Sequence, residues 1–190
     1  MARSNRERTE ATRLALIAAA RRLFVEKGYA ETATPDIVAE AGVTRGALYH
    51  HFEDKRALFR ATLEREAEAV AAQIEAASLP LGSPRAALLT GASAYFDAMA
   101  EPGRTRLLLL EAPAVIGFEG AGAIDKENAE GTLRRGLADL LGPDSGAARL
   151  QALTDLLSAA FDRAAIAIEA GAERKAYEAA IADLLDGLTA

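Results

Sequence analysis

The chain has 190 residues, a net charge of −6 and no cysteine. The lack of cysteine excludes disulfide bonds, thiolate catalysis and sulfur-ligated metals, and it suits a reducing cytoplasm. Hydrophobic residues make up 51% of the chain, enough for a substantial core, and the length favours one small and one medium-sized domain. The polar N-terminus predicts no secretory signal, and no apolar stretch is expected to approach the roughly 18 residues of a membrane span.

The first predicted helix runs from about residue 12 to residue 27. Its inward stripe consists of Ile17, Ala20 and Phe24, spaced at three to four residues as on one face of a helix. Gly28 is expected to end it, because glycine enters the left-handed conformation without steric cost. Four arginines stand at the leading end and form either a basic arm or a solvated tail with no fixed partner: Arg3, Arg6, Arg8 and Arg13.

Residues 34–52 predict two short helices joined by a turn. Thr34 is expected to cap the first, with Pro35 at the first helical position, where its missing N–H removes no hydrogen bond. Gly42 suits the left-handed conformation that ends this helix, and Thr44 is expected to cap the next. Two helices around a glycine turn are typical of a helix-turn-helix.

The second of these helices has an apolar side and a polar side. At about 100° per residue, Leu48 and Phe52 share the inward side. The remaining residues form an outward face that is small near its start and can hydrogen-bond beyond it: Arg45, Gly46, Ala47, Tyr49, His50 and His51. Such a face suits a DNA groove, where the N-terminal residues of a recognition helix meet base edges. The alternative is an ordinary helical hairpin whose polar face is solvated.

Charge is distributed unevenly along the chain. Residues 1–60 contain 11 Lys and Arg against 8 Asp and Glu, whereas residues 61–190 contain 11 against 20. Positive charge therefore gathers in the part with the predicted helix-turn-helix, as expected where phosphate neutralisation supplies affinity. The acidic remainder should repel DNA and leave one face of the molecule for the duplex.

Two stretches, residues 19–29 and 42–59, resemble the signature of TetR-type transcriptional regulators, and the match extends over about residues 9–68. The resemblance implies an all-α fold of about nine helices. A helix-turn-helix DNA-binding domain would occupy residues 1–68 and a ligand-binding and dimerisation domain residues 69–190. It also implies a homodimeric repressor that binds a palindromic DNA operator and is released by a small hydrophobic effector, whose identity stays open.

The same resemblance implies which residues meet DNA: Thr34, Thr44, Arg45, Gly46, Ala47, Tyr49, His50, His51 and Lys55. Arg45 is the expected base reader, because a guanidinium can grip guanine in a bidentate pair. Lys55 is expected to hold a phosphate together with the positive end of its helix. For His51, a phosphate contact and an intramolecular hydrogen bond are both left open.

Six further helices are predicted, at about residues 54–77, 83–100, 104–113, 125–141, 147–170 and 173–188. Asp54 and Ser83 are expected to cap the first two. The helix over 54–77 is too long for a three-helix head alone, so it is the expected mechanical link to the second domain. Pro113 is expected to bend or stop its helix, and the glycine-rich segment 117–122 to be irregular.

The last two helices are amphipathic, and in similar regulators they pair with their copies in a four-helix bundle. The resemblance implies a dimer interface from their apolar stripes: Leu150, Leu153, Leu157, Phe161, Ala164, Ile168, Tyr177, Ile181, Leu184 and Leu188. The alternative is that both stripes close the core of a single chain.

The resemblance implies an effector pocket inside the helices between the predicted helix 54–77 and the predicted helix 147–170. The candidates are mostly apolar, and each could equally be plain core: Phe96, Met99, Leu107, Leu110, Glu111, Val115, Ile116, Phe118 and Phe161. For Asp97, Arg106 and Glu111 two roles stay open: a polar anchor for the ligand, or a surface charge or structural pair. In regulators of this type, ligand shifts the domain between two packings and the half-site spacing no longer fits DNA.

Other functions fit less well. The chain has two histidines, adjacent in the predicted recognition helix, and it shows no metal-ligand constellation, nucleophile–base spacing or phosphate loop. No enzyme activity, cofactor or metal is therefore expected. An effector-independent or partner-regulated DNA-binding protein, including an activator, remains the main alternative.

Overall fold

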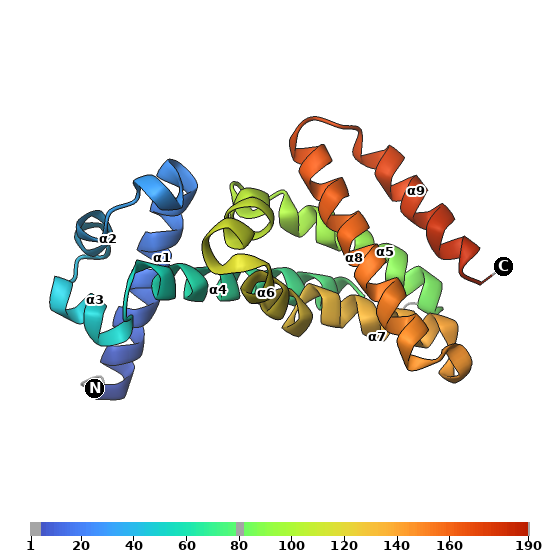
Figure 1. The fold of residues 1–190 in the computed structure, drawn as a ribbon, viewed down its shortest axis with the longest axis horizontal. Coiled ribbons are helices and arrows are strands. Elements are labelled where there is room, and N and C mark those ends of the chain that lie inside the picture. The colour runs from blue at the N-terminus through green and yellow to red at the C-terminus, as the bar shows by residue number, and fades with distance from the viewer. Residues whose placement is uncertain (1–4, 79–81, 190) are drawn as a thin grey trace.

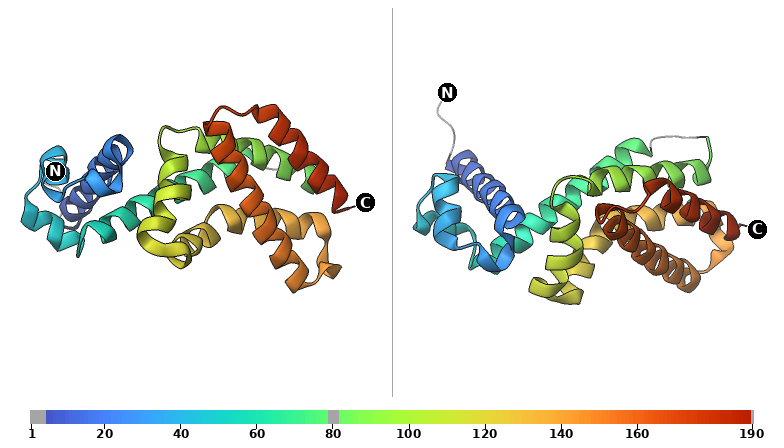
Figure 2. Two further views of the ribbon diagram at one scale, coloured as in Figure 1. Left: turned by 45° about the horizontal axis from the view of Figure 1, so that its top comes forward. Right: turned by 90° about the horizontal axis from the view of Figure 1, so that it is seen from above.

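The computed structural model describes residues 5–78 and 82–189, which form nine α-helices, a π-helical segment and a short 3-10 turn. Within these ranges no strand occurs, and the predicted all-α fold is confirmed. The molecule is elongated, with a small helical head at one end and a larger body at the other (Figure 1). The first helix lies in the head and the last helix lies in the body, far from the head (Figures 1 and 2).

The head contains α1 (Asn5–Glu31), α2 (Thr34–Ala41), α3 (Arg45–His51) and the first part of α4 (Lys55–Ala77). Helix α1 begins seven residues earlier than predicted, so Arg6 and Arg8 are helical rather than part of a flexible arm; Arg3 lies outside the described residues. The charged residues of this segment are good helix formers, and Thr12 also donates to the Arg8 carbonyl. Gly28, with φ 81°, interrupts α1 before a last turn.

Local capping predictions hold in the head except at one position. The residue that caps α2 is Ala33, whose carbonyl accepts from Asp36 and Ile37, and its side chain makes no capping bond. Thr34 is therefore the first helical residue rather than the cap, because α2 begins one residue earlier than predicted. Gly42 has φ 65° and ends α2 in the left-handed conformation, as predicted.

Helix α4 joins the two halves. Asp54 caps it by accepting from the Ala57 N–H at 2.7 Å, as predicted. Its 23 residues make it about 35 Å long. Leu63 and Ala67 belong to the apolar core shared with the head, whereas Val70 and Ile74 belong to the core of the body. The change of core falls near the predicted boundary at residue 68, although the boundary itself stays a prediction.

The body is built from seven elements: α5 (Pro84–Met99), η1 (Arg106–Glu111), α6 (Ala112–Glu127), α7 (Ala129–Leu141), η2 (Pro143–Ser145), α8 (Ala147–Glu169) and α9 (Arg174–Gly187). Ser83 caps α5 by accepting from the Ala86 N–H, as predicted. The hairpin of α8 and α9 lies at the end far from the head (Figure 1).

The segment from η1 through α6 differs from the prediction. Pro113 does not stop the helix, because the preceding turns are π-helical, with the Ala112 N–H bonded to the Leu107 carbonyl five residues back, and this wide turn accommodates the proline. The segment 117–122 is helical apart from Gly117, whose φ is 80°.

This continuity creates one helix, Arg106–Glu127, that is long and apolar enough to cross a membrane by length and composition, with mean hydropathy 1.6. The expectation that no apolar stretch approaches a span is thereby wrong. Its buried side chains nevertheless pack in the core shared with the head: Leu107, Ala112, Ile116 and Ile124. These four side chains attach the helix to the head core, although only 22% of its most apolar window is buried.

Candidate nucleic-acid interface

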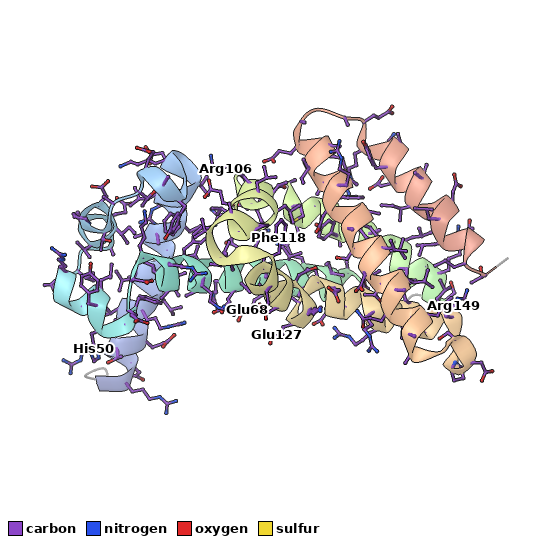
Figure 3. All side chains as sticks on the ribbon, viewed as in Figure 1. His50, Glu68, Arg106, Phe118, Glu127 and Arg149 are labelled. Atoms are coloured by element: carbon purple, nitrogen blue, oxygen red, sulfur yellow. The ribbon has the colours of Figure 1, made fainter. Side chains whose placement is uncertain are left out.

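Helix α3 buries one side and exposes the other. Leu48 is fully buried in the head core, and Phe52 follows it there. On the opposite side Arg45 and His50 are exposed, and Tyr49 is 45% exposed. His50 lies at the outer end of the head, pointing away from the body (Figure 3). The polar flank of α3 is therefore free to meet a large partner.

The first turn of α3 is held in place for such contacts. Thr44 caps it by accepting from the Ala47 N–H at 3.1 Å, as predicted. The Arg45 guanidinium lies 5.5 Å from the centre of the Tyr49 ring, a cation–π geometry that restricts the arginine. A Cβ at Gly46 would meet only Thr44 Oγ1, at 3.9 Å, so the fold itself does not require glycine there. A close external surface is one physical reason for a glycine at this position.

Lys55 is engaged inside the head. Its ammonium donates to the carbonyls of Tyr29 at 2.8 Å, Thr32 at 2.9 Å and Ala30 at 3.4 Å, and it lies 4.2 Å from the Tyr29 ring centre. An ammonium has three donors, and these contacts use them. The structure thus gives Lys55 the role of tying α4 to the end of α1, which argues against the predicted phosphate contact.

His51 is half-buried beside α1. Burial lowers the pKa of its imidazole, and the positive charges of His50 and Arg13 lower that pKa further. The lowered pKa favours the neutral ring, which is a weaker phosphate ligand than a cation. A role for His51 in DNA binding stays a prediction, as it does for the other residues of the predicted interface.

Glu66 on α4 connects the head to the body. Its side chain, 8% exposed, accepts from Arg21 Nε of α1 at 2.8 Å and from Arg104 Nε of the α5–η1 turn at 2.9 Å. Burial alone would raise the pKa of Glu66, but the hydrogen bonds from both arginines outweigh burial and lower it. Gly103 beside Arg104 allows the close approach, since a Cβ there would lie 2.7 Å from a Val25 methyl carbon.

A second set of contacts ties η1 to the end of α1. Arg106 donates to the carbonyls of Phe24 and Val25 at 2.6 Å each, and its side chain lies between the head and the body (Figure 3). Glu111 lies 3.3 Å from Arg106 and accepts from the Tyr29 N–H at 3.0 Å. Arg106 and Glu111 are therefore part of the contact with the head, not anchors of a ligand pocket.

Comparisons with known proteins agree with this geometry. The profile of bacterial regulatory proteins of the tetR family matches residues 16–62, and that of the tetracyclin repressor-like C-terminal domain matches residues 85–190, more than half of the chain. This chain belongs to the TetR family.

Relatives and a solved structure support the assignment. The HTH-type transcriptional regulator TtgR of Pseudomonas putida is 39% identical over 111 residues, which are 56% of this chain and 51% of TtgR. The HTH-type transcriptional activator FasR of Mycolicibacterium smegmatis is 29% identical over 109 residues, 57% of this chain and 50% of FasR. The chain spans about half the length of these curated relatives. A TetR-family regulator from Pectobacterium atrosepticum is 33% identical with a TM-score of 0.72, covering 98% of this chain and 95% of its own.

Two cavities in the described part of the body are well formed in this TetR-family chain. The η1 cavity, about 320 Å³, lies among α4, α5, η1, α6 and α8 and also touches the start of α7. The α7 cavity, about 310 Å³, lies among α4, α5, α7 and α8 and also touches the end of α6. Tyr95, Asp125, Ala129 and Asp162 line both and so form a shared wall. Of the predicted pocket residues, Met99 and Phe118 line the η1 cavity and Phe161 lines the α7 cavity.

Six predicted pocket residues line neither cavity: Phe96, Leu107, Leu110, Glu111, Val115 and Ile116. Phe96 is core of the body, Leu107 and Ile116 are core on the head side, where Val115 also packs, and Leu110 is exposed. The η1 and α6 residues among them lie away from both cavities because one face of this helix turns toward the head, and a ligand role for the six stays a prediction. Sequence analysis missed the polar wall residues Tyr95, Asp125 and Asp162. Asp162 beside Phe161 on an apolar stripe was the available signal.

The predicted dimer stripe is largely core of the single chain. Five of its members are buried without any partner subunit: Leu150, Leu157, Phe161, Ala164 and Ile181. For these residues the alternative of an internal core holds. Exposed apolar side chains on the other sides of the hairpin include Leu156, at 69%, and the predicted Leu184, at 52%.

Proposed function

We propose that this TetR-family chain is a homodimeric transcriptional repressor that binds a palindromic operator through α3 and is released by a small, mostly apolar effector. The observation that carries the proposal is the exposed flank of Arg45, Tyr49 and His50 on α3, opposite the side that packs in the apolar core of the head. A guanidinium beside an aromatic ring can reach both a base edge and the groove wall.

Dimerisation follows from the small size of α3. Its seven residues are about 10 Å long and reach few base pairs. Two copies about one helical turn of DNA apart, roughly 34 Å, would read two half-sites. The exposed sides of α8 and α9, with Leu156 and Leu184, are the proposed contact between copies, because apolar side chains of that size favour burial.

The head–body contact supports a mechanism of release. One side of η1 and α6 binds the end of α1 through Arg106 and Glu111, while Leu108, Leu109 and Pro113 line the η1 cavity. A ligand that prefers a wider cavity would shift this helix, and with it the head and α4. Such a switch requires different ligand affinities in the two states.

Selection of binding sites from random duplex DNA tests the proposal. The purified protein should enrich an inverted repeat, with half-sites protected one helical turn apart. Enrichment of no sequence, at low as well as moderate salt, would remove the proposed function. A reporter assay with the selected site then determines the sign of regulation, which matters because FasR is named an activator. We further infer a cytoplasmic location and no enzymatic role.

A further inference from the structure

The η1 cavity has a mostly apolar lining with an acidic wall. Leu63, Val70, Met99 and Leu109 supply apolar surface from α4, α5 and η1. Its volume of about 320 Å³ is at the lower end of the range for small-molecule pockets. The lining includes two carboxylates, Asp125 from α6 and Asp162 from α8, and no lysine or arginine among the described residues that form it.

These carboxylates are hydrogen-bonded but not neutralised. Asp162 accepts from the Tyr95 hydroxyl at 2.7 Å, and Asp125 accepts from the Ser158 hydroxyl at 3.1 Å. Neither forms a salt bridge with a cation in the described part of the chain, although Glu66, also buried, has two arginines. Burial raises the pKa of Asp125 to about 6, and the negative charge of Asp162 contributes to that rise. Two neighbouring carboxylates without a counter-ion favour binding of a positively charged ligand.

Aromatic groups complete the arrangement. The Tyr95 ring lies in the same wall as the two carboxylates, and Phe118 lines the η1 cavity although its side chain is 86% exposed. Phe118 follows Gly117, whose positive φ breaks the helix at this point (Figure 3). Aromatic faces attract organic cations, and combined with carboxylates they recognise ammonium groups on apolar bodies.

We propose that the η1 cavity binds an organic cation, an amine or quaternary ammonium on a compact apolar body, with Asp125 and Asp162 as its counter-charges. The inference rests on the proposed function in taking this cavity as the effector site. It specifies the effector class, which a mainly apolar lining alone does not.

Two probes of nearly equal shape test the charge requirement: phenyltrimethylammonium, a cation, and tert-butylbenzene, its neutral counterpart. Binding to the full-length protein is measured by calorimetry and by the shift in thermal unfolding. We expect the cation to bind at least about tenfold more tightly, the equivalent of about 1.4 kcal/mol. Equal affinities, tighter binding of the neutral probe, or no binding of either would overturn the proposal.

Amide variants locate the site. Asp162→Asn and Asp125→Asn preserve the shape of the side chain. Each should weaken binding of the cationic probe by about tenfold or more and leave the affinity for the neutral probe unchanged. Asp155→Asn is the matched control, since Asp155 is exposed on the same helix as Asp162 and lies outside both linings. Cation binding that survives both cavity substitutions would overturn the proposal.

Operator release by the cation is measured separately, so that the two hypotheses fail independently. Carboxylate-dependent binding without release would support the cation site and contradict the proposed effector response. Release of the operator by the neutral probe, with no preference for the cation, would support the proposed effector response and contradict the cation site.

Discussion

Two buried acidic sites in this TetR-family protein are built in opposite ways. At the head–body contact, Glu66 is neutralised by Arg21 and Arg104, and its pKa is lowered. In the cavity wall, Asp125 and Asp162 accept hydrogen bonds from the Ser158 and Tyr95 hydroxyls but form no salt bridge in the described part of the chain, and their pKa values are raised. The first site is complete and serves as a structural joint, whereas the second still lacks a counter-charge. The difference separates a residue that holds the fold from residues available to a ligand.

The largest effect is expected from Glu66→Gln. This change leaves Arg104, almost fully buried, without its counter-ion, and should lower the free energy of unfolding by about 3 kcal/mol. Urea unfolding followed by circular dichroism, at fixed protein concentration, measures it. Glu64→Gln on the same helix is the control, because its pair with Arg60 is half exposed and should contribute less than about 1 kcal/mol. Similar losses in both variants would contradict the assigned role of Glu66.

The pH dependence of stability should have opposite signs at the two sites. Because the folded pKa of Asp125 is about 6 against 3.8 in the unfolded chain, the native state holds this proton more tightly between those values. The contribution of Asp125 to stability therefore falls as pH rises from about 4 to about 7, by about 2 kcal/mol. Glu66, with a lowered pKa, contributes stability that is lost on acidification.

Comparison of wild type with Asp125→Asn isolates the first effect. Around Asp125 lie Asp162 of α8, Glu130 of α7, the Ser158 hydroxyl and the neighbouring Lys126. Near neutral pH the variant should have the higher free energy of unfolding, by about 2 kcal/mol, because wild type buries an ionised carboxylate. The difference should vanish near pH 4, where the folded wild type holds Asp125 protonated. A difference that stays constant with pH would show that Asp125 titrates normally.

A smaller effect is expected from Lys55→Met, which removes the hydrogen bonds to the Tyr29 and Thr32 carbonyls. Stability should fall by about 1–2 kcal/mol. At temperatures where the variant is folded, its affinity for the selected operator and its salt dependence should match the wild type. A clear drop in the number of counterions released on DNA binding would contradict this expectation and support the phosphate contact implied by the family resemblance.

What could be predicted from sequence depended on how local the cause was. The turn at Gly42 and the caps at Thr44, Asp54 and Ser83 are set by neighbouring residues, and the structure confirms them. Thr34 was misplaced by a single position, since threonine before proline can stand on either side of a helix start.

Long-range features were not predictable in the same way. An apolar stripe such as that of α8 does not reveal whether its own chain or a second copy covers it, and Leu157 is covered by its own chain. The cavity residues depend on which face of η1 turns to the head. The sequence predicts a helix that starts at about residue 125, whereas Asp125 lies near the end of α6, because α6 continues past Gly117.

The central claim is that α3 reads base sequence, and fluorescence anisotropy with Arg45→Ala tests it most directly. Affinities are measured for the selected operator and for a scrambled duplex at the same salt, with Arg65→Ala as control, an exposed arginine on α4 outside the helix-turn-helix. Arg45→Ala should lose about 1–3 kcal/mol on the operator and much less on the scrambled duplex, whereas the control should change neither. Equal losses on both duplexes would contradict base reading by Arg45.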